Sequence, residues 1–455
     1  MTDQEKLNHL EQLLAKALIR VSELEALVLK LSTPKNSTNS SIPPCVDFTY
    51  KNQSLRGKSN KPVGGQKGHQ GHTLKMSDTP DIIEKISPNF CNACGLSLIE
   101  SAMSLMSARQ VIDIPPIVPT VTEYQCFSAV CTCGHHQKSN FPEGVTNHIQ
   151  YGPNIETLIV YNSVYQFLPF ARLQDFFKKV INVNLSKATI ENVIRRTSKK
   201  AIPAYEAIKE VISISFFVGS DETGFKLNKR KGWFWVWQNA LVTYIVAACT
   251  RSKEVINEQF PHGLPNTILC TDRLPAQLST FSKGIQICLA HLLRDLNYLI
   301  ELENANWATE FRTLLKDAIT LKQSLIEHDK NDSRILQIEH MADKLLESSY
   351  LEALNLDNQK YKQTITFYNA MNKLRHGLFP FLYDPRVPFD NNSSERAIRN
   401  VKIKTKVSGQ FKSLHQEFAI IRSVIDTAIK NGKSVYHAIN EMVNMPMPQT
   451  VSSAG

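Results

Sequence analysis

Three acidic residues stand where a metal-dependent reaction could use them. Asp221 follows the apolar, β-rich run 212–218, and Asp272 follows a second short apolar run, residues 266–270. The carboxyl ends of strands form the ligand-binding edge of an open α/β sheet, so both aspartates are expected at that edge. Glu395 lies at the start of a helix, in the segment Asp-Asn-Asn-Ser-Ser-Glu-Arg.

Each of these residues also has an ordinary structural interpretation. An aspartate after a strand is commonly a turn former. If Asn392 caps the helix, Glu395 is the third residue of a capping box and needs no other role. However, residues 396–412 contain six Lys and Arg and no acid. A basic surface around one carboxylate favours a site that holds phosphates against metal ions.

A sheet must position the carboxylates. It is expected to contain an early hairpin, predicted over residues 232–238 and 241–249. Three carboxylates from separated segments on such a sheet suggest a ribonuclease-H-like α/β fold. Oxygen ligands of this kind hold Mg²⁺ or Mn²⁺, and two such ions support in-line displacement at phosphorus. The predicted chemistry is phosphodiester cleavage and strand transfer.

Four cysteines are paired at spacings typical of a structural zinc site. Cys91 and Cys94 have a two-residue gap, Cys131 and Cys133 a one-residue gap, and a glycine follows each pair. Two such turns supply four thiolates for Zn²⁺. His135, His136 and Cys126 are alternative ligands, and small buried cysteines without metal are the structural alternative. Strands are expected between the pairs, at residues 109–114 and 120–126.

The first 75 residues carry two further patterns. Leu7, Leu14, Val21 and Val28 recur every seven residues beside a second series of Leu10, Ala17, Leu24 and Leu31. These are the a and d positions of a coiled coil, which favours self-association over docking on the protein's own body. Residues 51–75 then contain six Lys and Arg, including Lys58, Lys61 and Lys67, five glycines and no acid. Such a strap can follow phosphates, although a solvated linker has the same composition.

The composition excludes several classes of protein. The 455 residues carry a formal net charge of +10 and a pI near 9.0, which favours a polyanionic partner. Nine cysteines are too few and too metal-like in spacing for a disulfide scaffold. The longest apolar run is residues 240–249, too short to span a bilayer. A cytoplasmic, nucleoid-associated protein without a membrane partner is expected.

The remaining segments are predicted to be helical. Residues 151–165, 171–180 and a segment after the Ser186 cap form a helical bridge. Residues 300–385 have helical periodicity and are expected to form an insertion in the core. Cys288 and His291 lie one turn apart before that insertion. They could reach the site or bind metal, but a buried Cys and a satisfied His packing the insertion are the favoured interpretation.

The sequence resembles the bacterial DDE transposases of the insertion-sequence sixty-six type over almost its whole length. The matching segments, besides the zipper and cysteine pairs, are KNSTNSSIPP (35–44), GGQKGHQGH (64–72), YGP from 151, DETGF (221–225), CLAHLLRDL (288–296), DNNSSERAIR (390–399) and RSVIDTAIKNG (422–432). The resemblance implies that Asp221, Asp272 and Glu395 are the catalytic triad of a DNA transposase. It also implies double-stranded DNA and small accessory proteins as partners.

Two positions depart from that family. Arg273 occupies a place where the family usually has glycine, and its side chain could crowd the metal or contact DNA. Residues 404–409 keep the charge of the family's Arg-Lys-Asn run but only part of its pattern. The alternative function is a catalytically decayed copy that still binds DNA.

Together these observations predict a multidomain transposase that binds the ends of its insertion sequence. The expected domains are a coiled-coil helix (1–32) that forms a dimer, a basic linker that contacts DNA (33–86), a zinc-binding module (87–137), a helical bridge (150–210), a ribonuclease-H-like catalytic core (211–299 and 386–435), a helical insertion (300–385) and a C-terminal tail (436–455). The expected DNA contacts are Lys58, Lys61, Lys67, Arg396, Arg399, Lys402, Lys404 and Lys406.

Overall fold

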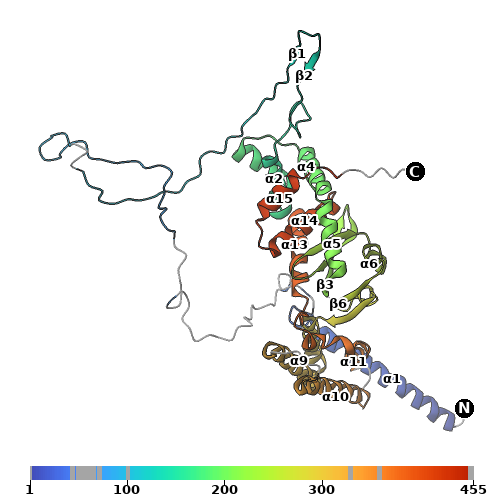
Figure 1. The fold of residues 1–455 in the computed structure, drawn as a ribbon. Helices are drawn as coiled ribbons and strands as arrows, with labels where there is room; N and C mark the ends of the chain where they lie inside the picture. Colours follow the sequence, from blue (N-terminus) through green and yellow to red (C-terminus); the bar gives the residue numbers. More distant parts are fainter. Residues whose placement is uncertain are drawn as a thin grey trace. The chain divides into compact units, whose positions relative to one another are not determined.

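The computed structural model describes residues 3–40, 42, 47, 68, 74–98, 103–325, 331–355 and 361–448 (Figure 1). Residues 1–50 together with 121–455 form one unit, and residues 51–120 form a second. Lys58, Lys61 and Lys67 lie outside the described residues. Among the helices that are described, none combines the length and hydropathy needed to cross a membrane.

A five-stranded mixed sheet forms the centre of the first unit. Its strand order is β5-β4-β3-β6-β7; β3, β4 and β5 pair antiparallel, and β3, β6 and β7 pair parallel. The hairpin predicted over residues 232–238 and 241–249 is confirmed as β4 and β5, which pair antiparallel. Asn228 and Lys229 both have positive φ and form the tight turn between β3 and β4. The strand bounds are β3 (Phe217–Leu227), β4 (Arg230–Gln238), β5 (Thr243–Ala248), β6 (Leu264–Thr271) and β7 (Ser282–Ile287), of which β7 was not anticipated from the sequence.

The predicted strand from Ile212 is wrong at its first residues. Helix α5 (Ile202–Ile214) continues through them, and β3 begins only at Phe217. The helix persists because Tyr205, Ile208 and Ile212 recur every three to four residues and bury one stripe against the sheet. Asp221 therefore lies within an eleven-residue strand and not at its end.

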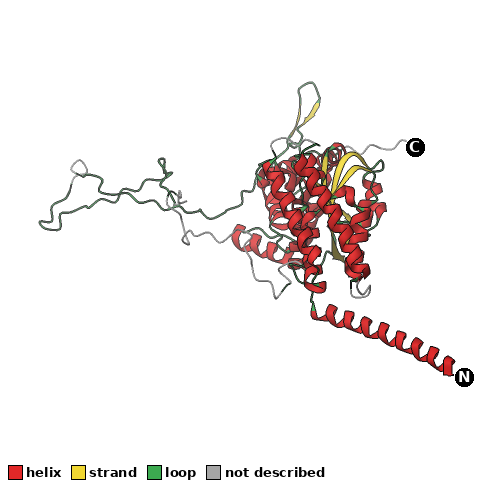
Figure 2. Cartoon of the chain, turned by 90° about the horizontal axis from the view of Figure 1, so that it is seen from below, coloured by secondary structure: helices red, strands yellow, loops and turns green. Residues whose placement is uncertain are grey.

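Alternate residues of β4 face two hydrophobic layers, so helices cover both faces of the sheet (Figures 1 and 2). Phe234 and Val236 pack on one layer and Trp235 and Trp237 on the other, each at most 1% exposed. The first layer includes α2 (Pro153–Val160), η2 (Tyr161–Tyr165), α3 (Phe170–Phe176), η3 (Phe177–Ile181), α4 (Lys187–Lys200), α13 (Asn392–Ser408), α14 (His415–Lys430) and α15 (Val435–Asn444). The second includes α5, α6 (Lys253–Gln259) and α7 (Pro275–Leu278).

Several predicted helices are confirmed at the level of their caps and packing. Ser186 caps α4, and its Oγ accepts a hydrogen bond from the Thr189 N–H at 2.9 Å. Residues 435–444, assigned almost entirely to a tail, instead form α15, which Ser434 caps and which buries Ile439 and Met442. Residues 289–383 share their own hydrophobic core. They form α8 (Leu289–Glu303), α9 (Asn306–Ser324), α10 (Ser333–Asn355), α11 (Lys362–Lys373), η4 (Arg375–Gly377) and α12 (Pro380–Tyr383).

The N-terminal heptads form one helix, α1 (Asp3–Ser32). Its apolar seam is exposed along its length, with Leu14 62%, Val28 64% and Leu31 74% exposed. The seam is therefore not covered by other described residues of the same chain. The segment after α1 is anchored: Asn39 is 2% exposed and its Nδ2 donates to Glu301 on α8, at 2.5 Å.

The cysteine-bearing segments contain less regular structure than predicted. Residues 109–114 and 120–126 form no strand; the only strands in the described residues before α2 are β1 (Ser128–Val130) and β2 (His136–Lys138). No described residue in 74–98 or 103–150 is buried. Apolar alternation without a partner surface is not enough to form a strand here.

Candidate active site

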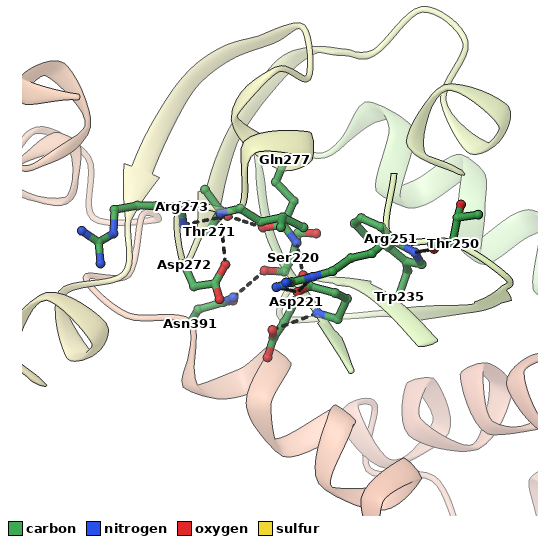
Figure 3. A network of polar contacts seen from close by, with 12 residues as sticks. Ser220, Asp221, Trp235, Thr250, Arg251, Thr271, Asp272, Arg273, Gln277 and Asn391 are labelled. Atoms are coloured by element: carbon green, nitrogen blue, oxygen red, sulfur yellow. Dashed lines mark hydrogen bonds and ion pairs between the residues drawn. The ribbon is translucent and has the colours of Figure 1, made fainter. Parts of the chain in front are cut away.

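The sheet register brings Asp221 and Asp272 together. The last parallel pair between β3 and β6 is Gly219 with Cys270, and each aspartate lies two residues beyond its member of that pair. Residues two apart on a strand share a face, so both carboxylates project to the same side. Carboxylate oxygens of Asp221, Glu222 and Asp272 lie within 4.8 Å of one another. The first two predicted acidic residues thus meet in space (Figure 3).

Contacts between α13 and β3 bring Glu395 close to the carboxylate cluster, although Glu395 lies outside the group whose oxygens are within 4.8 Å of one another. Asn391 Nδ2 donates to the Ser220 carbonyl at 2.6 Å, and Ser394 Oγ donates to Asn391 Oδ1 at 2.6 Å. Gly219 permits this approach, because a Cβ there would lie 2.5 Å from Asn391 Oδ1. The start of the helix is therefore fixed against the strand that carries Asp221 (Figure 3).

Glu395 is not part of a capping box. The cap residue of α13 is Asn391, not Asn392, and its side chain makes no capping hydrogen bond. Glu395 Oε1 is buried and has no hydrogen-bond partner in the described part of the chain. This oxygen forms an ion pair with Arg294 Nη1 at 3.7 Å and lies near the Asp221 carboxylate. A metal cation would stabilise such a group of neighbouring carboxylates.

The electrostatics of Asp221 support this interpretation. Burial raises the pKa of Asp221 well above its usual value, and the nearby carboxylates of Asp272, Glu222 and Glu395 raise it further. Like charges this close disfavour simultaneous ionisation. The donor set consists of hard oxygen atoms only, which suits Mg²⁺ or Mn²⁺.

Glu222 belongs to the cluster but has other partners. Its Oε1 accepts hydrogen bonds from Arg251, with Nε at 2.8 Å, and its Oε2 accepts one from Gln277 Nε2 at 2.9 Å. Burial raises the pKa of Glu222, and Asp272 raises it further, while Arg251 opposes both effects. Both oxygens of Glu222 are therefore engaged within the protein.

Arg273 does not block the cluster. Its backbone has φ +76°, a conformation that glycine adopts most readily, which explains why a glycine would suit this position. The guanidinium forms an ion pair with Asp295 on α8 and extends away from Asp221 (Figure 3). The predicted crowding of the metal site is therefore absent.

His291 and Arg294, one turn apart on α8, are site residues that sequence reasoning underestimated. His291 Nε2 and Arg294 Nη1 each lie 3.7 Å from Glu395 Oε1. Burial lowers the pKa of His291 and the Arg294 charge lowers it further, while Asp272 and Glu395 act in the opposite direction. The favoured packing role is wrong for His291 but fits Cys288, which is buried and whose Sγ accepts the Asn391 N–H at 3.2 Å. The i, i+3 spacing of His291 and Arg294 was the available signal.

The predicted DNA contacts on α13 divide into two kinds. Arg396, Arg399, Lys402 and Lys406 are exposed. Lys404 is mostly buried instead: its Nζ donates to the Ser163 carbonyl at 3.0 Å, and burial lowers its pKa to about 8. Its ammonium group joins α13 to η2, so Lys404 is removed from the set of DNA contacts.

Each cysteine pair lies in its own tight turn. The Gly95 N–H donates to the Cys91 carbonyl at 2.9 Å, and the Gly134 N–H donates to the Cys131 carbonyl at 2.8 Å. Backbone hydrogen bonds from Ala93 and Cys94 lower the pKa of Cys91, and one from Cys133 lowers that of Cys131. Cys91 and Cys94 belong to one unit, Cys131 and Cys133 to the other.

Comparison with known proteins is consistent with this geometry. Among curated proteins, no sequence matches the chain. The sequence model of the Transposase IS66 family matches residues 148–417, more than half of the chain, including Asp221, Asp272, His291 and Glu395. The chain therefore belongs to the IS66 family of transposases.

Proposed function

We propose that the chain cleaves DNA at the ends of its insertion sequence and joins those ends to target DNA, with Asp221, Asp272 and Glu395 as catalytic residues. The sheet order β5-β4-β3-β6-β7 supports a ribonuclease-H-like core, because it combines an antiparallel hairpin with two parallel strands. The single observation that carries the proposal is the cluster of Asp221, Glu222 and Asp272, whose carboxylate oxygens lie within 4.8 Å of one another, with Glu395 on α13 close enough to raise the pKa of Asp221.

Asp221, Asp272 and Glu395 would hold two Mg²⁺ or Mn²⁺ ions. When bound, such ions supply the Lewis acidity for in-line displacement at a phosphodiester. The protein contributes orientation: Asn391 fixes the start of α13, and Arg251 and Gln277 restrain Glu222. Arg294 lies beside Glu395, where its remaining N–H groups can bind a phosphate oxygen of the substrate.

Three further parts support DNA handling. The exposed seam of α1 fits a second copy of the same helix, which would make a dimer. The lowered thiol pKa values favour the thiolates that a structural Zn²⁺ requires, so we retain Cys91, Cys94, Cys131 and Cys133 as its ligands. Exposed basic residues on α13 supply phosphate contacts beside the carboxylates.

A decayed, DNA-binding copy is the alternative that Arg273 suggested. Its ion pair with Asp295 removes that argument, because the guanidinium does not enter the carboxylate cluster. The Asp-Asp-Glu set is complete in this chain, which favours an active enzyme.

Labelled DNA carrying an element end, incubated with the full chain and Mg²⁺, tests the proposal. The expected result is cleaved and joined product with the wild type and with the control variant Glu310→Gln, an exposed residue of α9. Glu395→Gln is expected to bind the DNA without forming product. Bound but uncut DNA with the wild type would support the decayed copy, and cut but unjoined DNA would indicate a nuclease without strand transfer.

A further inference from the structure

A basic groove lies where the β3–β4 hairpin meets the C-terminal end of α13. Its volume is about 490 Å³, and it is lined in part by Lys226, Lys229, Lys231 and Lys406. Among the described residues, no acidic side chain lines it. Gly224 and Gly409 also border the groove and present only backbone there, so its walls leave room for a ligand.

The tip of the hairpin is held in place by the loop after α13. The Asn228 N–H donates to the Phe411 carbonyl at 3.0 Å, and the Phe411 N–H donates to the Lys226 carbonyl at 2.8 Å. The Lys229 N–H donates to Gln410 Oε1 at 3.0 Å. The backbone that carries these lysines is therefore positioned in advance, which lowers the entropic cost of binding.

Both walls of the groove lead back to the carboxylate cluster. Lys226 lies five positions beyond Asp221 on β3, roughly 16 Å at about 3.3 Å per residue. Lys406 lies three helical turns beyond Glu395 on α13, roughly 16 Å at about 1.5 Å per residue. Lys226 and Lys406 thus lie at similar distances from the residues of the cluster, equal to about five base pairs of duplex at about 3.4 Å each.

We propose that this groove binds backbone phosphates of duplex DNA about five base pairs from the cleaved bond. Lysines act as point charges that bind phosphate without reading base sequence. Sites for single strands combine basic groups with exposed aromatic platforms. Of the described residues that line this groove, the one aromatic residue is Phe225, which is only 5% exposed. The inference rests on the proposed function, since it takes the same DNA as ligand.

The test compares two triple variants of the full chain. Lys226→Gln/Lys229→Gln/Lys231→Gln neutralises the hairpin wall, and Lys178→Gln/Lys187→Gln/Lys253→Gln is the control on exposed lysines of other segments. The dissociation constant for duplex DNA is measured against salt concentration. Three lost phosphate contacts should reduce the slope of log affinity against log salt concentration by about 2.7. In a footprinting experiment, the DNA backbone should lose protection about five base pairs from the cleavage point. The control should retain the wild-type slope.

An unchanged slope in the hairpin variant would overturn the inference. So would a loss confined to single-stranded DNA. If the triple variant does not fold, Lys229→Gln alone should still reduce the slope by about 0.9. If the wild type binds duplex DNA but never cleaves it, and the hairpin variant still loses salt slope, the groove is supported and the proposed catalysis is contradicted. A wild type that does not bind duplex DNA overturns both.

Discussion

The carboxylate cluster and the cysteine-bearing residues 74–150 represent two ways of placing chemical groups. The cluster lies on a sheet whose neighbouring side chains, such as Phe234, Trp235 and Val236, are completely buried. In the cysteine-bearing residues, Ile86 is 96% and Met106 95% exposed. The first region has a core that holds its ligands in place before any ion binds. The second has none in the described residues.

This difference indicates where metal affects folding. Carboxylates fixed by a core repel one another, so a cation relieves repulsion that folding has already imposed. Thiolates in exposed turns gain their order from the ion itself. Mg²⁺ would therefore change catalysis, and Zn²⁺ would change structure.

The largest effect on DNA cleavage is expected from a substitution in the carboxylate cluster. Asp221→Asn should lower the rate of DNA cleavage by about 10⁴-fold, because one ligand of the cluster is lost while the surrounding core remains. Single-turnover cleavage of labelled DNA measures this rate. Asp317→Asn, an exposed acidic residue of α9, is the control and should cleave at the wild-type rate. Cleavage by Asp221→Asn within tenfold of wild type would contradict the assignment.

On the exposed side, Cys91→Ser should remove zinc from the purified chain, from about one ion to none. It should also increase proteolysis within residues 87–137, because the ion orders that segment. Metal analysis and limited proteolysis measure both effects, and Cys249→Ser, an exposed cysteine outside the predicted module, should change neither. Undetectable zinc in the wild type would remove the zinc module.

A smaller effect tests the close approach of α13 to β3. Gly219→Ala places a Cβ 2.5 Å from Asn391 Oδ1 and should lower the free energy of unfolding by about 2 kcal/mol. Cleavage should fall as well, because Glu395 shifts with the helix. Gly224→Ala on the same strand is the control, since its Cβ meets nothing closer than 3.6 Å. Equal unfolding free energies for the two variants would contradict this account of Gly219.

Lys404 allows buried and exposed cations to be compared on one helix, because it is mostly buried while the other basic residues of α13 named above are exposed. Its pKa of about 8 in the folded chain lies below the ordinary 10.5, so the unfolded chain binds more protons between these values. The free energy of unfolding should therefore rise with pH across this window, by at most about 2 kcal/mol between pH 8 and 9.5 from this residue. Urea unfolding of Lys404→Met should lack that contribution, while its salt slope for DNA stays at the wild-type value.

Much of the cluster was predictable, for physical reasons that vary from residue to residue. Asp272 follows a short apolar run that can hardly be anything but a buried strand, and Glu395 follows a clear helix start. The exact place of Asp221 was not predictable, because Ile208 and Ile212 suit a helix and a strand equally well until tertiary packing decides. His291 was misjudged because its partner Glu395 lies more than a hundred positions away in the chain. Gly219 gave no sequence signal, since its role depends on a helix brought in from the far end of the core.

Mn²⁺ binding to the full chain, followed by electron paramagnetic resonance, tests the central claim most directly. The account predicts that wild type and Glu222→Gln bind Mn²⁺, because the oxygens of Glu222 are engaged by Arg251 and Gln277. Asp221→Asn and Glu395→Gln should each weaken Mn²⁺ binding by at least about tenfold, one ligand being worth at least about 1.4 kcal/mol. Wild-type affinity in Glu395→Gln together with lost affinity in Glu222→Gln would contradict the claim.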